Sequence, residues 1–145
     1  MLIVCGYKDA LTCYQYADNV VSVGDRGSNN FVPPCQGQNY LRLQFDDDMK
    51  ISKSDLLPFF YWLQKVRLPS SNLIHCYMGI SRSTALGLIF LIEKGWGINE
   101  SISYLYRTRK FFCPNLKILQ IYGNKKLIDS LRKYPAFEQE YRDFL

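Results

Sequence analysis

The chain has 145 residues, 48% of them hydrophobic and 21% charged, so it can bury an ordinary core, and we expect a single domain over residues 1–145. Five cysteines without a C-x-x-C pair, and one histidine, argue against a disulfide framework and a metal site and favour an intracellular, reducing, cytoplasmic location. The formal net charge of +5 suits an anionic substrate or a nucleic-acid surface without selecting either.

Four short runs are rich in apolar and β-branched residues and predict strands at 2–5, 19–24, 40–45 and 72–76. Segments with helical spacing alternate with them and predict helices at roughly 9–16, 55–67, 82–95, 98–109, 115–131 and 136–144. The long irregular stretch is 25–39, rich in Gly, Asn and Pro. This order predicts an α/β fold with a mostly parallel, twisted central sheet of about four to five strands flanked by helices.

Three boundaries carry local signals. Ser54 is predicted to cap the helix at 55–67, with Pro58 near its first turn, where proline is tolerated. The Gly-Trp-Gly at 95–97 ends one helix, and Cys113-Pro114 interrupts the chain before the next.

The apolar run at 85–92 is too short to cross a bilayer, so we expect no membrane partner.

The topology of the predicted sheet indicates where a ligand would bind. Ligands of open parallel sheets bind at the carboxyl ends of the strands. The loops after 19–24, 40–45 and 72–76 should therefore converge on one point, at Cys76.

The stretch "HCYMGISRS" at 75–83 predicts a strand that ends at Cys76, a five-residue loop and the start of a helix. The backbone N–H groups of Tyr77, Met78, Gly79, Ile80 and Ser81 can turn toward one point and form an anion nest, to which the following helix start adds its own. Gly79 avoids crowding in the turn, and Arg82 can grip two phosphoryl oxygens as lysine cannot. The same field would stabilise a Cys76 thiolate, so a nucleophile at the floor of an anion nest predicts phosphoryl transfer.

The same stretch resembles the H-C-x5-R-[ST] signature of the cysteine-dependent protein tyrosine phosphatases. Its residues are especially similar to those of the compact dual-specificity and bacterial-type branch. The resemblance implies attack by Cys76 on phosphorus, a phosphocysteine intermediate, and hydrolysis without metal or other cofactor. It also implies that Ser83 assists departure of the sulfur and that His75 orders the loop. Residues 81–115 resemble the family's stretch after the loop, which implies that Asn115 braces it.

A general acid is expected in "FDDDMK", directly after the strand at 40–45. Similar enzymes place this aspartate roughly thirty residues before the cysteine, which fits Asp46, Asp47 and Asp48. Counting from Phe45 as the last apolar strand position, the resemblance favours Asp47, with Asp46 second.

Several hypotheses about the function fit the same residues. The leading one is a monomeric enzyme acting on phosphorylated proteins, at phosphotyrosine and also at phosphoserine or phosphothreonine. The same chemistry on RNA 5′ ends or phosphoinositides is a second reading, less favoured because related RNA enzymes carry Thr-Gly after the loop arginine and lipid enzymes carry loop lysines. A phosphate-binding pseudophosphatase and a sulfurtransferase are further alternatives. The basic runs 107–110 and 124–126 are interpreted as exposed helical faces, so nucleic-acid binding is not favoured.

Overall fold

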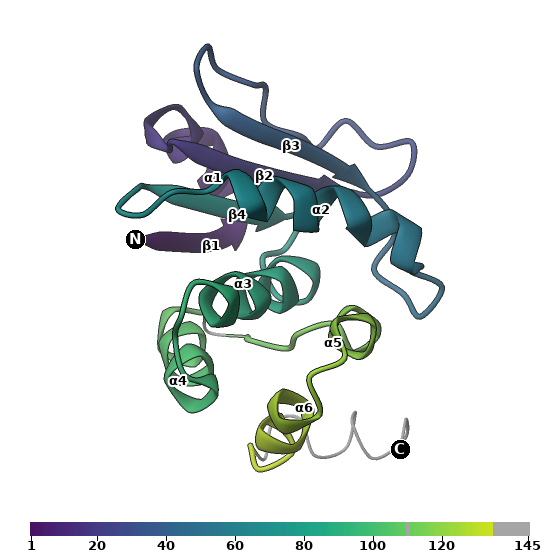
Figure 1. The fold of residues 1–145 in the computed structure, drawn as a ribbon. Helices are drawn as coiled ribbons and strands as arrows, with labels where there is room; N and C mark the ends of the chain where they lie inside the picture. Colours follow the sequence, from purple (N-terminus) through teal and green to yellow (C-terminus); the bar gives the residue numbers. More distant parts are fainter. Residues whose placement is uncertain (110, 135–145) are drawn as a thin grey trace.

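A computed structural model describes residues 1–109 and 111–134 of the chain. Within them lies a parallel four-stranded sheet formed by β1 (Leu2–Gly6), β2 (Asn19–Gly24), β3 (Asn39–Gln44) and β4 (Asn72–Cys76), in the order β1-β4-β2-β3 (Figure 1). The predicted α/β fold with a parallel sheet is confirmed, and each predicted strand lies within one residue of the observed one.

Helices cover both faces of the sheet (Figure 1). Residues of α1 (Tyr7–Cys13) pack with Cys5, Val20 and Leu73 on one face, and a short 3₁₀ turn (Tyr14–Tyr16) follows α1. The larger core, on the other face, is shared by α2 (Lys53–Lys65), α3 (Arg82–Glu93), α4 (Ile98–Thr108), α5 (Leu116–Tyr122) and α6 (Lys125–Leu131). Because alternate strand residues face opposite sides, Cys76 points to the larger core and Cys5 to α1.

The helix that follows β4 is nearly all buried, from Arg82 to Leu91. Gly87 allows α3 to approach β1, because a Cβ at this position would lie 2.8 Å from Cγ2 of Val4 and 3.3 Å from Cδ1 of Leu105. The close contact holds the middle of α3 against β1, on the face of the sheet to which Cys76 also points.

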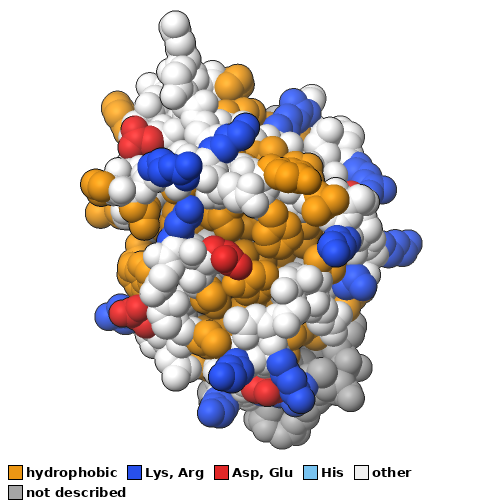
Figure 2. Space-filling view, viewed as in Figure 1, with side chains coloured by type: hydrophobic (Ala, Val, Ile, Leu, Met, Phe, Trp, Pro, Cys, Tyr) orange, Lys and Arg blue, Asp and Glu red, His pale blue; other side chains and the backbone are white. Residues whose placement is uncertain are grey.

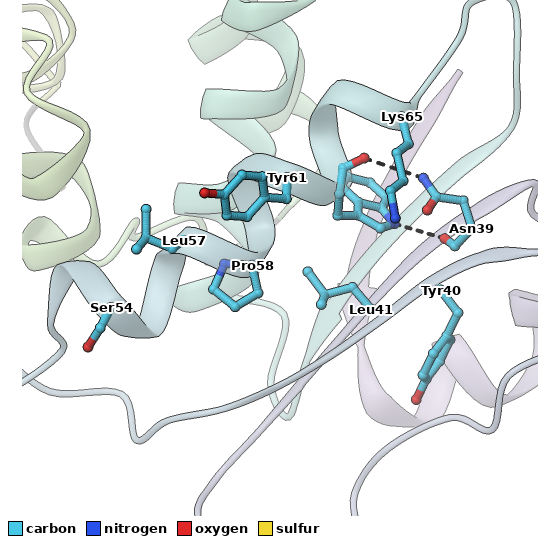
Figure 3. Close-up of a pocket in the computed structure, with 9 residues that line it drawn as sticks. Asn39, Tyr40, Leu41, Ser54, Leu57, Pro58, Tyr61 and Lys65 are labelled. Atoms are coloured by element: carbon cyan, nitrogen blue, oxygen red, sulfur yellow. Dashed lines mark hydrogen bonds between the residues drawn. The ribbon is translucent and has the colours of Figure 1, made fainter.

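The predicted start of α2 was wrong by two residues. Ser52, not Ser54, is the N-cap: its Oγ accepts the N–H of Asp55, while the Asp55 carboxylate accepts the N–H of Ser52. Pro58 consequently lies inside the helix, beyond the first turn. It lines a cavity of about 410 Å³ between α2 and β3, facing Leu41 (Figure 3), so the carbonyl that loses its helical partner can be hydrated.

The predicted helix at 115–131 is two helices. Gly123 ends α5 in the left-handed conformation, with φ of +80°, and Asn124 begins α6 by accepting the N–H of Leu127 on its side chain. Both signals were in the sequence as Gly-Asn. The predicted helix at 136–144 lies outside the described residues.

The irregular stretch after β2 packs along the α1 face of the sheet. Val32 is buried, and its N–H donates to Oγ of Ser22. The Phe31 ring covers Gly24, where any Cβ would meet the ring, and the Arg42 guanidinium lies 3.9 Å from the ring centroid. These contacts fix the segment beside the carboxyl end of β2.

On the face seen in Figure 2, apolar side chains gather in the middle, between α2 and α5, with lysines and arginines around them. The rings of Phe60 on α2 and Tyr122 on α5 stack with centroids 6.5 Å apart, so these two helices contact each other through aromatic side chains. Among residues 1–109 and 111–134, no helix has the length and apolar character needed to cross a membrane.

Candidate active site

The loop between β4 and α3 is held from outside through its carbonyl groups. All five carbonyls of residues 77–81 accept hydrogen bonds from surrounding elements: Tyr77 from Tyr7 N–H, Met78 and Gly79 from Arg109, Ile80 from Cys113 N–H, and Ser81 from Asn115 N–H. In a trans peptide the N–H points opposite to the C=O. Since each carbonyl shares its peptide with the N–H of the next residue, the N–H groups of residues 78–82 point away from these outside partners, as an anion nest requires.

Gly79 is required in this loop for two reasons. Its φ is +71°, in the left-handed region that favours glycine, and a Cβ there would collide with the backbone of Cys5 and Gly6. The loop thus presses directly on the end of β1.

Cys76 lies at the base of the loop and is only 2% exposed. Its sulfur accepts the N–H of Gly79 at 3.2 Å and lies 3.1 Å from Oγ of Ser83, in the first turn of α3. For a thiolate, which can only accept, the Ser83 hydroxyl becomes the donor. Two donors to the sulfur would stabilise its negative charge.

Arg82 brings together all three loops at the carboxyl edge of the sheet. Its Nη1 donates to the Asp25 carboxylate after β2, at 2.7 Å, and to the carbonyl of Phe45 after β3, at 2.8 Å. The side chain is 5% exposed, yet Nε has no hydrogen-bond partner among the described residues. A buried guanidinium with an unpartnered N–H is suited to an anionic ligand, because leaving that donor unpaired is costly.

The three aspartates of the acidic loop have different partners. Oδ1 of Asp47 accepts Oγ–H of Ser81 at 2.7 Å and Nδ2–H of Asn115 at 2.8 Å. Asp46 instead accepts the N–H of Arg26, and Asp48 accepts the N–H of Lys50. Of the three, Asp47 is the one joined by its side chain to the loop that holds Cys76.

Asn115 connects three parts of this site. Its side chain caps α5 by accepting the N–H of Ile118 and donates to Asp47, while its N–H donates to the carbonyl of Ser81. It is 8% exposed, so these bonds face little competition from water.

His75 is buried on the opposite face of β4 from Cys76. Its Nδ1 lies 3.2 Å from the Cys76 carbonyl, which can only accept, so Nδ1 carries the proton. Its Nε2 lies 2.6 Å from Oγ of Ser22. Burial lowers the pKa of His75, which favours a neutral ring whose Nε2 accepts the Ser22 hydroxyl.

Two site residues escaped the sequence reasoning. Asp25 directly follows a predicted strand, at the edge of the sheet where the site was expected, and this position could have marked it as a site residue. It was passed over because it begins the irregular stretch at 25–39. Arg109 was interpreted as part of an exposed basic face, whereas its Nε and Nη2 donate to the carbonyls of Gly79 and Met78 at 2.9 and 3.3 Å. Lys110, at the end of the same basic run, lies outside the described residues.

Comparison with known proteins identifies relatives over most of the chain. The family model "Dual specificity phosphatase, catalytic domain" matches residues 5–125. Tyrosine-protein phosphatase yvh1 of Schizosaccharomyces pombe is 29% identical over 157 residues, covering 92% of this chain and 46% of the relative. The chain therefore spans less than half the length of that relative.

Solved structures share the fold. Human DUSP28 superposes with a TM-score of 0.66 at 20% identity, covering 90% of this chain and 93% of its own. A human tyrosine phosphatase-like serine/threonine/tyrosine-interacting protein gives the same TM-score at 19% identity, covering 89% and 93%. At these identities the likeness concerns the fold alone.

Proposed function

The chain belongs to the dual specificity phosphatase family within the cysteine-dependent phosphatases, and from this membership we propose that it hydrolyses phosphotyrosine, and also phosphoserine or phosphothreonine, in proteins. The observation that carries the proposal is the loop at 77–81, whose carbonyls are all bonded from outside while Cys76 lies at its base. The inward N–H groups and the unpartnered Nε of Arg82 would bind the phosphoryl oxygens.

In the first step, the Cys76 thiolate attacks phosphorus. An S–P bond forms, and the bond from phosphorus to the substrate oxygen breaks. Asp47 donates a proton to the departing oxygen, so that tyrosine or serine leaves as the neutral alcohol. Among the described residues both hydrogen bonds to Asp47 use Oδ1, which leaves Oδ2 to carry the transferred proton.

In the second step, water attacks the phosphocysteine. Asp47, now ionised, takes a proton from the water while an O–P bond forms and the S–P bond breaks. The Ser83 hydroxyl, 3.1 Å from the sulfur, donates to the departing thiolate and makes it a better leaving group. Inorganic phosphate is released, and both Cys76 and Asp47 return to their starting states.

The alternatives differ in substrate or in turnover. RNA 5′ ends and phosphoinositides would use the same loop, while a pseudophosphatase would bind phosphate without hydrolysing it. The presence of Cys76, Arg82, Ser83 and an aspartate contacting the loop favours turnover. We also propose that the chain works in a reducing compartment, because the nucleophile must remain a thiol. That residues 1–145 form one domain and act as a monomer is a further part of the proposal.

Hydrolysis of para-nitrophenyl phosphate by the purified chain, with vanadate as inhibitor, tests the proposal. We expect vanadate-sensitive turnover that is lost in Cys76→Ser. A folded wild-type chain that shows no such turnover would overturn the enzyme assignment. Phosphopeptides, RNA 5′ ends and inositol phosphates, compared by kcat/KM, then discriminate among the substrates.

A further inference from the structure

A second cavity, of about 500 Å³, opens beside the phosphate-binding loop on the side of α1. Tyr77 and Met78, the first two residues after the nucleophile, form one wall, and Tyr7 and Leu11 of α1 form part of the other. Asp47, in contrast, contacts the last residue of the loop, Ser81. The cavity therefore adjoins the loop at the end remote from the general acid.

The cavity is surrounded by apolar side chains that the fold leaves uncovered. Leu11 is 45% exposed, Tyr77 50% and Met78 60%. Exposed apolar residues scattered singly are normal in proteins, but three around one cavity next to a catalytic loop indicate a surface that an apolar group covers.

The charges at the cavity favour an anionic neighbour. Lys8 and Arg109 lie at its lining with one acid, Asp9. Arg109 is held there by its bonds to the carbonyls of Gly79 and Met78, so its position is fixed by the loop itself. A phosphopeptide carrying acidic residues complements this excess of positive charge.

We propose that this cavity binds an apolar side chain of the phosphorylated protein substrate, within about three residues of the phosphorylated one and beside an acidic residue. The proposal rests on the function proposed above and specifies its substrate class. An extended chain advances about 3.3–3.6 Å per residue. A substrate whose phosphate lies over Cys76 therefore reaches a cavity walled by Tyr77 and Met78 within a few residues.

The test uses a phosphotyrosine peptide in which a leucine with a glutamate next to it is moved through the flanking positions from −3 to +3, all other flanking positions being alanine. The reference peptides carry alanine in place of the leucine. Affinity for the Cys76→Ser chain is measured by fluorescence anisotropy, which needs no turnover. We expect leucine at one position to bind about tenfold more tightly than alanine, from burial of its extra methyl and methylene groups. Adding Leu11→Ser should reduce this ratio to less than about twofold, and adding Lys8→Glu should weaken binding of the acidic peptides as a set.

Tyr61→Ser provides the matched control. Tyr61 is 63% exposed and lines the other cavity, between α2 and β3 (Figure 3), so its replacement should leave the leucine preference unchanged. Equal binding of leucine and alanine at every position would overturn the proposal. A leucine preference that persists in Leu11→Ser would also overturn it. Binding of a second copy of the chain in the cavity, detected by sedimentation, or of lipid, detected by vesicle binding, would overturn it as well.

The two proposals fail separately. Leucine preference without para-nitrophenyl phosphate turnover by the wild-type chain would reject the enzyme and keep the subsite. Turnover without leucine preference would reject the subsite alone.

Discussion

Asp47 illustrates how a single residue is selected from three identical neighbours. The sequence places Asp46, Asp47 and Asp48 together, but among the described residues it is the carboxylate of Asp47 that accepts hydrogen bonds from Ser81 and Asn115. Its carboxyl group is thus fixed relative to the loop that holds Cys76, whereas Asp46 accepts the N–H of Arg26 in the loop after β2 and Asp48 accepts the N–H of Lys50 in its own loop.

Replacing Asp47 by Asn should reduce kcat on phosphopeptides by about 10²- to 10⁴-fold, the usual contribution of a general acid. Asp46→Asn is the matched control and should change kcat by less than about tenfold, because its partner is the backbone of Arg26. Steady-state kinetics on one phosphotyrosine peptide measures both. A larger loss in Asp46→Asn would assign the acid to that residue.

The burial of His75 leads to a prediction about how the stability of the fold depends on pH. Burial lowers its pKa below the usual 6.5, so in the window just below that pH the unfolded chain binds a proton that the folded chain does not. The stability contribution is complete above the unfolded pKa and is lost as the pH falls toward the folded one. One group contributes at most about 1.4 kcal/mol per pH unit to the slope.

Urea unfolding between pH 5 and pH 8 tests this expectation. The free energy of unfolding of the wild-type chain should fall more steeply toward acid than that of His75→Asn, whose amide nitrogen can still reach the Cys76 carbonyl. Parallel curves would show that His75 is not the group responsible.

The site residues that the sequence revealed are those at fixed spacing along the chain. Cys76, Arg82 and Ser83 could be found because their spacing is local, and Asp47 because it follows a strand. Asp25 also follows a predicted strand, but nothing local in the sequence shows that it pairs with Arg82, 57 residues away. Ser22 could not be found, because its contact with His75, 53 residues away, depends on strand register. Arg109 was missed because a basic run on a helix usually faces solvent.

At the scale of the elements, the start of α2 shows which of two serines the backbone uses. Ser52 lies three residues before Asp55, and this spacing closes a reciprocal capping box. The hydroxyl of Ser54 lies 2.8 Å from Oγ of Ser52 and caps no helical N–H among the described residues.

Ser52→Ala should therefore lower the free energy of unfolding by about 1 kcal/mol, the usual cost of losing an N-cap. In Ser54→Ala the capping bonds remain, so we expect a change below about 0.5 kcal/mol. Urea denaturation of the two variants decides between the two positions. An equal loss in both would mean that the capping box does not act alone.

Element boundaries were harder to predict than element types. The run at 115–131 has one apolar face throughout, so its periodicity predicts a continuous helix, but Gly123 adopts a left-handed φ and Asn124 starts a new cap. The local turn signal outweighed the periodicity because a glycine followed by a capping residue satisfies the backbone groups of both helix ends.

At the scale of the whole molecule, the site is a junction of three loops carried by three strands. Arg82 connects the loops after β2 and β3 to the start of α3, and Asp47 connects the acidic loop to Ser81 and Asn115. An oxyanion bound in this junction, as proposed, would contact groups that are assembled only in the folded chain.

Vanadate should therefore stabilise the entire fold. At a concentration of 100 times its Kd, a ligand that binds only the folded chain adds about 2.7 kcal/mol to the free energy of unfolding, which corresponds to a rise of several degrees in Tm. Differential scanning fluorimetry should show this rise in the wild-type chain and lose it in Arg82→Met. Equal shifts in both would place the anion elsewhere.

The strand order β1-β4-β2-β3 also bears on how the chain reaches this state. β4 lies between two strands that precede it, and its first residue, Asn72, contacts Asn19 and Met1, which are 53 and 71 residues earlier. Contacts so distant along the chain form slowly, because a long loop must close before they stabilise anything. Because β4 pairs with both β1 and β2, its insertion completes the sheet and places Cys76 beside the other loops in the same event, so a partly folded chain lacks the assembled candidate site.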